Sequence, residues 1–258
     1  MSYENNWKYK YIIMTHGSLF SGIGGFELGA QYAGIETLWS CEIEKFQRGI
    51  LKKYFPKTEI YEDIRKTTGL QYVDIISGGF PCQDISIAGK GKGIRGERSG
   101  LWSEMFRIIR EVRPKYVVIE NSPMLLVRGF ERVLCDLSQI GYDAEWQCIS
   151  NSSFGFPHRR ERVYICAYPD ENRRTKIQVF SNFLIEKRES FHREFSGMSC
   201  SKFWSEDYTE FLRVDNGIPY NVHRIEAIGN AVNPIVTHYL FECIKIFDNK
   251  LNGKEINI

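Results

Sequence analysis

Short apolar segments alternate with helical periods through the first two-thirds of the chain. The segments typical of strands are rich in β-branched or aromatic residues, and they occupy 15–20, 37–42, 72–77, 116–120, 144–150 and 162–167. Strands and helices that alternate at this length predict an α/β fold, with a mostly parallel sheet covered by helices on both faces.

Helical periodicity is clearest in two segments. The apolar residues that share a helix face are Leu101, Met105, Ile108, Ile109 and Val112 in the first, and Phe130, Val133, Leu134, Leu137 and Ile140 in the second. Gly34 and Gly141 stand where helices should stop. Near the end of the chain, 233–247 is typical of a closing helix with Pro234 in its first turn.

The α/β pattern fails between 169 and 222. This stretch is polar, charged and aromatic and has no sustained periodicity. We therefore expect three parts: an α/β domain over 1–168, a small separate region over 169–222, and a segment over 223–258 that returns to the first domain.

Composition narrows the class of protein. A hydrophobic content of 43% suits a single globular core. No apolar run reaches the roughly 18 residues of a membrane helix, and the N-terminus lacks a signal core, so we expect a cytoplasmic protein that binds no membrane. The seven cysteines are scattered without a C-x-x-C pair, which argues against a disulfide framework and against a metal site. A net charge of +2 says little about partners.

A glycine-rich turn at 18–27 joins the first strand to a helix, where backbone N–H groups can approach a ligand closely. Glu27 stands where the dinucleotide fingerprint has its third glycine. Glu42 ends the second strand, a place that suits ribose hydroxyls, and Asp63 follows at a strand end, where it could accept from an adenine amino group. Each acid could equally be an ordinary surface group.

Cys82 follows an apolar strand within Gly78-Gly79-Phe80-Pro81-Cys82-Gln83. In open α/β sheets ligands bind beyond the carboxyl ends of the strands, so this thiol would point into the crevice. The loop 88–100 that follows is rich in glycine and basic residues, and neighbouring positive charge favours the nucleophilic thiolate.

Two further motifs carry chemistry. Glu120 and Asn121 end an apolar strand, where a carboxyl group tends to have a raised pKa and can donate a proton near neutral pH. Arg160 and Arg162 lead into another strand, and alternation places them on one face.

Taken in order, these motifs resemble the DNA cytosine-5 methyltransferase family, bacterial or phage type, over about 14–167 and 213–247. The resemblance implies a Rossmann-like S-adenosylmethionine-dependent methyltransferase fold, with 169–222 as a small target-recognition region. It implies transfer of a methyl group from S-adenosylmethionine to C5 of cytosine in a specific double-stranded DNA sequence. It further implies base flipping and a covalent bond between Cys82 and C6.

The family's site residues map onto this sequence one by one. Those implied to be catalytic are Cys82, Glu120, Arg160 and Arg162. Those implied to bind the cofactor are Phe20, Gly22, Ile23, Gly24, Gly25, Glu42, Asp63, Ile64, Pro81, Leu101, Asn230 and Val232. Those implied to bind the base or the DNA are Gln83, Ser86 and Asn121. The loop 88–100 resembles the family's mobile loop, which closes over the flipped base.

His158 stands where the family usually has glutamine. We expect a monomer, and a cognate restriction endonuclease that acts separately would suit the family. The alternatives are methylation of RNA and a catalytically inactive DNA-binding relative. A nicotinamide-dependent oxidoreductase would leave Pro81-Cys82-Gln83 unexplained, and a cysteine hydrolase would need a histidine base, for which only His158 lies near a motif.

Overall fold

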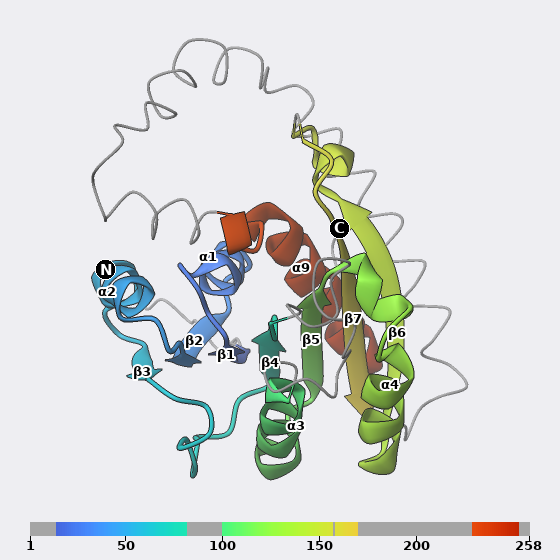
Figure 1. Ribbon diagram of the computed structural model, residues 1–258, viewed down its shortest axis with the longest axis horizontal. Coiled ribbons are helices and arrows are strands. Elements are labelled where there is room, and N and C mark those ends of the chain that lie inside the picture. The colour runs from blue at the N-terminus through green and yellow to red at the C-terminus, as the bar shows by residue number, and fades with distance from the viewer. Residues whose placement is uncertain (1–13, 82–99, 157, 170–228, 253–258) are drawn as a thin grey trace, which may run out of the picture.

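The computed structural model describes residues 14–81, 100–156, 158–169 and 229–252. Its centre is a seven-stranded sheet in the order β3-β2-β1-β4-β5-β7-β6 (Figure 1). The strands are β1 (Thr15–Leu19), β2 (Glu36–Cys41), β3 (Glu59–Tyr61), β4 (Ile75–Gly78), β5 (Tyr116–Asn121), β6 (Tyr142–Ser150) and β7 (Glu161–Pro169). Only β7 runs against its neighbours in this sheet, which confirms the predicted, mostly parallel arrangement.

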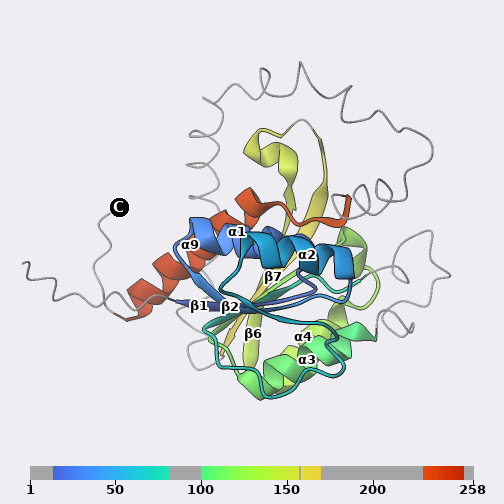
Figure 2. The same cartoon turned by 90° about the vertical axis from the view of Figure 1, so that its left-hand side faces the viewer.

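Helices cover both faces of the sheet. They are α1 (Gly25–Tyr32), α2 (Lys45–Tyr54), α3 (Leu101–Val112), α4 (Phe130–Gln139) and α9 (Pro234–Leu251), with short 3-10 turns η2 (Pro123–Leu126) and η3 (Asn151–Phe154). Figure 2 shows α1, α2 and α9 on one face and α3 and α4 on the other. Among the described residues, no helix combines the length and the apolar character needed to cross a membrane.

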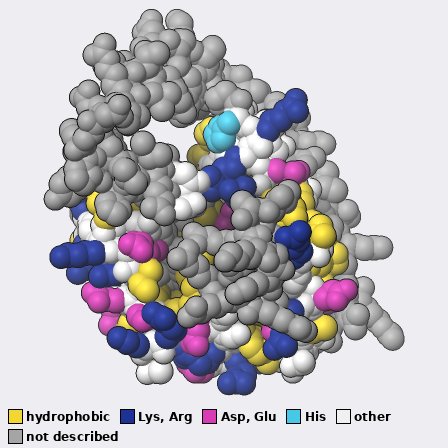
Figure 3. Space-filling view, in the orientation of Figure 1, with side chains coloured by type: hydrophobic (Ala, Val, Ile, Leu, Met, Phe, Trp, Pro, Cys, Tyr) yellow, Lys and Arg dark blue, Asp and Glu magenta, His cyan; other side chains and the backbone are white. Residues whose placement is uncertain are grey.

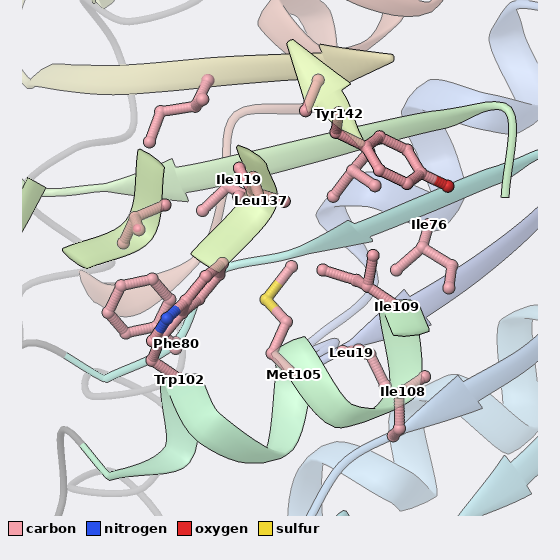
Figure 4. Packing of buried hydrophobic residues seen from close by; sticks show 14 of the residues in the cluster. Leu19, Ile76, Phe80, Trp102, Met105, Ile108, Ile109, Ile119, Leu137 and Tyr142 are labelled. Atoms are coloured by element: carbon pink, nitrogen blue, oxygen red, sulfur yellow. The ribbon is translucent and has the colours of Figure 1, made fainter. Parts of the chain in front are cut away.

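Strand alternation divides the buried side chains between two cores. On β5, Val118 faces the core beneath α1 and α9, whereas Ile119 faces the core beneath α3 and α4. In the second core, Met105 of α3 packs among side chains from β1, β4 and β5 (Figure 4). Both cores consist mainly of apolar side chains, and they hold the strand ends at fixed positions.

Local signals account for the helix ends. Gly34 and Gly141, the predicted stops, have positive φ angles of 67° and 76°. The predicted closing helix is present as α9, with Pro234 in its first turn and the Asn233 side chain accepting from the Ile235 N–H at 3.0 Å. The segment that carries α9 therefore does return to the main domain.

The order of the strands in the sheet predicts where a ligand binds. From β1 the order runs one way to β2 and β3 and the other way to β4 and β5, so it reverses between β1 and β4. Ligands of open α/β sheets bind at such a switch point, beyond the carboxyl ends of the strands. The glycine turn follows β1, and Gly79-Phe80-Pro81 follows β4. The region 169–222 lies outside the described residues from residue 170 onward.

Candidate active site

The turn after β1 is shaped by backbone angles that are rare outside glycine. Phe20, Gly22 and Gly24 have φ angles of 56°, 58° and 94°. A positive φ in a residue with a side chain is uncommon and tends to occur at functional sites. At Gly25 an added Cβ would lie 2.3 Å from the Val232 carbonyl oxygen, so the first turn of α1 and the late motif are in direct contact.

Glu42 closes this turn from the next strand. Its Oε2 accepts from the Gly22 N–H at 2.7 Å, and its Oε1 accepts from the Glu44 N–H at 2.9 Å. Burial raises the pKa of the carboxyl group, while these backbone donors oppose the shift. Each oxygen keeps a further lone pair for a ligand hydroxyl. The structure thus gives Glu42 a role in holding the turn that sequence reasoning missed.

Asp63, Ile64 and Leu101, which are expected to bind the cofactor, differ in their burial and in their contacts. Both Asp63 oxygens accept from the Arg65 guanidinium, at 2.9 Å each, which lowers the pKa of Asp63. The Ile64 side chain is buried in the core beneath α3. Leu101 is half-buried against that same core. Of these three residues, Asp63 is the one with a polar side chain.

Glu120 and the two arginines form a cluster on one face of the sheet. Glu120 ends β5 opposite Tyr164 of β7, and its Oε1 lies 3.0 Å from the Arg162 Nε. Burial raises the pKa of Glu120 against the opposing charges of Arg162 and Arg160. Basic side chains gather around an acidic one in the middle of the face shown in Figure 3. Both arginines are thus close enough for their charges to act on the Glu120 carboxyl group.

Arg160 has a second attachment. Its Nη1 donates to the Gly229 carbonyl oxygen, and burial, then the charge of Arg162, lowers its pKa. Arg160 therefore links the catalytic face to the segment that leads into α9. Asn230, next in the chain, is exposed, and Val232 is half-buried beside α1.

Asn121 supports the backbone rather than facing outward. Its side chain is buried, its Nδ2 donates to the Phe80 carbonyl oxygen at 3.2 Å, and its Oδ1 accepts from the Ser122 N–H at 2.8 Å. Phe80 precedes Pro81, which is half-buried and is the last described residue before Cys82. Asn121 thus holds the chain at the start of the Pro-Cys-Gln motif beside Glu120.

Cys82, Gln83 and Ser86 lie outside the described residues, as does most of the loop 88–100. Their predicted roles therefore remain predictions. What the structure does describe is the chain on both sides of them, at the carboxyl end of β4 and at the start of α3.

Gly79 leaves the space that the Glu120 carboxyl group occupies. A Cβ added at Gly79 would lie 2.7 Å from the Glu120 Oε2. The Gly79→Ala variant should therefore displace the carboxyl group and lower the rate of the reaction that the resemblance implies by up to about 10²-fold, the cost of misplacing a reacting group by roughly 1 Å. Single-turnover assays measure the change. Gly49→Ala, on an exposed position of α2 with no atom within 4 Å of the added carbon, is the control that should keep full activity.

Glu27 and His158 make contacts that the sequence motifs did not indicate. Glu27, in the first turn of α1, is 1% exposed and accepts from the Ser40 Oγ at 2.7 Å beneath the glycine turn. Its pKa is raised by burial. His158, at the position of the family's glutamine, is exposed, and its Nε2 lies 2.9 Å from the Asn151 Nδ2.

The sequence is similar to a known protein family and to several of its members. The family model for C-5 cytosine-specific DNA methylases matches residues 14–210. The chain is 39% identical over 158 residues to the type II methyltransferase M2.BsuMI of Bacillus subtilis. This alignment covers 58% of this chain and 41% of that protein. It is 30% identical over 228 residues to the type II methyltransferase M.CviJI of Paramecium bursaria Chlorella virus IL3A. This alignment covers 86% of this chain and 57% of that protein.

A solved structure agrees in fold. The crystal structure of the Dnmt2 methyltransferase of S. pombe has a TM-score of 0.53 at 21% identity, covering 66% of this chain and 53% of that one. The chain spans about half the length of the curated relatives it matches. Because the family model covers most of the chain and includes every described strand, the protein belongs to the family of C-5 cytosine-specific DNA methylases.

Proposed function

We propose that this protein transfers a methyl group from S-adenosylmethionine to C5 of cytosine in double-stranded DNA, with Cys82 as covalent nucleophile. Membership of the family supports the reaction. The observation that carries the proposal is the position of Glu120, a buried carboxyl group held 3.0 Å from Arg162 beside the chain that enters the Pro-Cys-Gln motif.

The described residues fit the cofactor. The turn at 20–25 follows β1 at the switch point. At Gly22 the nearest atom to an added Cβ is the Gln47 Oε1 at 3.9 Å, so this glycine leaves room for a ligand beside the turn. Glu42 would accept from the ribose hydroxyls, and Asp63 from the adenine amino group, in exchange for its exposed and therefore weak ion pair with Arg65. S-adenosylmethionine, when bound, supplies an activated methyl group.

Cys82 is assigned the first bond to the base. Its thiolate would add to C6 of cytosine, and the electron pair of the C5–C6 double bond would then make C5 nucleophilic. After methylation, C5 gives its proton to water, the electron pair of that C–H bond re-forms the C5–C6 double bond, and the S–C6 bond breaks with its electron pair returning to Cys82 as the thiolate. N3 then returns its proton to Glu120. C6 is inaccessible in a stacked duplex, so the base must first be flipped out.

Glu120 is assigned the N3 side of the ring. Its Oε1 is held by Arg162 at 3.0 Å, while Oε2 fills the space beside Gly79. A carboxyl group with a pKa raised by burial carries its proton at a higher pH than an exposed one, so it can donate to N3 as Cys82 adds. Negative charge then does not accumulate in the ring.

The region 169–222 is assigned to the target sequence, as the resemblance to the family implies. From residue 170 onward this region lies outside the described residues. Double-stranded DNA is the proposed partner and a monomer the proposed state, in the cytoplasm. A restriction endonuclease of the same specificity would act separately.

Bisulfite sequencing tests the proposal directly. The protein is expressed in a host strain that has no cytosine-5 methylation of its own, and genomic DNA is sequenced after conversion. We expect protected cytosines within one short recurrent sequence, and none in DNA from cells that express the Cys82→Ala variant. Uniform conversion in both samples, with soluble protein present, would reject the proposed activity.

A further inference from the structure

Arg107 of α3 contacts a turn at the cofactor side of the molecule that lies 40 residues away in sequence. Its Nη2 donates to the Thr67 carbonyl oxygen at 3.0 Å and to the Ile64 carbonyl oxygen at 2.8 Å. Both carbonyls belong to the turn that follows Asp63. A side chain of α3 thus reaches the backbone of the loop that is expected to bind adenine.

All three nitrogens of the Arg107 guanidinium have acceptors. The Nε donates to Glu104 at 2.9 Å, Nη1 donates to the Glu111 carboxylate, whose oxygens lie 3.0 and 3.1 Å away, and Nη2 donates to the two carbonyls. The side chain is 22% exposed, so these bonds are partly shielded from water. Two acids on the same helix fix the planar group, and its free edge is aimed at the turn.

The turn itself is a single helical turn that does not continue. The Lys66 and Thr67 N–H groups both donate to the Asp63 carbonyl oxygen, at 2.9 and 3.1 Å, and the Thr67 hydroxyl donates to it at 2.9 Å. In a longer helix the next carbonyls would accept from later N–H groups. Here the Ile64 carbonyl accepts from the Thr67 N–H at 3.3 Å, and the guanidinium of Arg107 supplies a second, shorter bond to Ile64 and the donor for Thr67.

We propose that Arg107 is a positioning residue for the adenosine end of the cofactor, acting through the backbone of the 63–67 turn. This inference rests on the proposed function. By fixing the Ile64 and Thr67 carbonyls, Arg107 sets where the Asp63 carboxyl group stands at the crevice. It also ties that turn to α3, the helix that begins directly after the segment carrying Cys82.

The test compares Arg107→Met and Arg107→Lys with Arg110→Met, which changes an exposed arginine on the same helix. The probes are S-adenosylhomocysteine and 5′-methylthioadenosine, measured by calorimetry on the full chain. Arg107→Met should weaken both ligands by about tenfold, because two hydrogen bonds from a charged donor are lost. Arg107→Lys, which can reach one carbonyl, should give a smaller loss. Arg110→Met should bind as the wild type does.

Kinetics and exchange provide readouts that a general loss of stability would not give. In Arg107→Met the KM for S-adenosylmethionine should rise while kcat at saturating cofactor stays unchanged, and hydrogen exchange should quicken at the amides of Lys66 and Thr67. If Arg107→Met fails to fold in a melting assay, Arg107→Lys carries the comparison.

The outcomes separate the two proposals. If the wild type binds both probes and the Arg107 variants bind as tightly as Arg110→Met, the positioning role is overturned and the proposed function stands. A loss confined to S-adenosylhomocysteine, or a fall in kcat at constant KM, also overturns it, since the adenosine end is common to both probes. If the wild type binds neither probe, the proposed function fails and the inference fails with it.

Discussion

Replacing Cys82 by alanine should abolish methyl transfer to DNA while S-adenosylhomocysteine still binds within a few-fold of the wild-type affinity. The thiolate of Cys82 is the group that would add to C6. Alanine has no group that could form this bond. Without that addition, C5 of cytosine is too weak a nucleophile to take a methyl group. Transfer of labelled methyl groups to duplex DNA measures the loss.

A matched control comes from another thiol. Cys135, exposed on α4, can be replaced by alanine and should leave activity unchanged. Duplex DNA that contains 5-fluorocytosine provides a direct check, because after methylation C5 carries no proton to lose, so the S–C6 bond should persist. We expect a denaturation-resistant complex with the wild type and with Cys135→Ala, but none with Cys82→Ala. Wild-type rates in Cys82→Ala would disprove the covalent route.

Replacing Glu120 by glutamine should slow methyl transfer by roughly 10²–10⁴-fold, the range expected when general acid catalysis is lost. Glutamine is close in shape, so Arg162 and Gly79 should keep their places. It can donate a hydrogen bond to N3 but cannot transfer a proton to it. Single-turnover rates at saturating DNA and cofactor report this chemical step, and Glu131→Gln, exposed on α4, serves as the control.

The pH dependence gives the second signature of Glu120. Burial raises its pKa, so the protonated form that donates to N3 is lost as the pH rises through that raised value. The wild-type rate of the chemical step should therefore fall on the alkaline side, and the Glu120→Gln variant should lack this fall because its amide does not ionise. A loss of less than about threefold in the variant, with the wild-type pH profile intact, would remove Glu120 from proton transfer.

Much of the fold could be predicted because strand and helix periods depend on residues close in sequence. The apolar runs at 116–120 and 162–167 lie within β5 and β7 as observed. The strand β3 was missed because Glu59–Tyr61 is too short to show a period, and it is held by pairing with Trp39, Ser40 and Cys41 of β2. Its existence depends on a neighbour distant in sequence.

The candidate site could be predicted as a set of residues but not as a set of contacts. Asn121 was expected at the substrate, yet its amide holds the Phe80 carbonyl 41 residues away. Arg107 drew no attention, since an arginine on an amphipathic helix is usually solvated. Sequence motifs identify chemical groups, whereas the direction of each side chain is decided by partners that the motif does not contain.

The position of α9 bears on how the enzyme is made. The Thr237 hydroxyl donates to the Gly25 carbonyl oxygen, and the Lys245 ammonium group to that of Ala33, in both cases across 212 residues. A ribosome releases the chain from its N-terminal end, so the side of α1 that packs against α9 stays uncovered until the residues of α9 have been made. Contacts between residues so far apart in sequence form slowly, and the apolar surface exposed in the meantime favours aggregation of nascent chains.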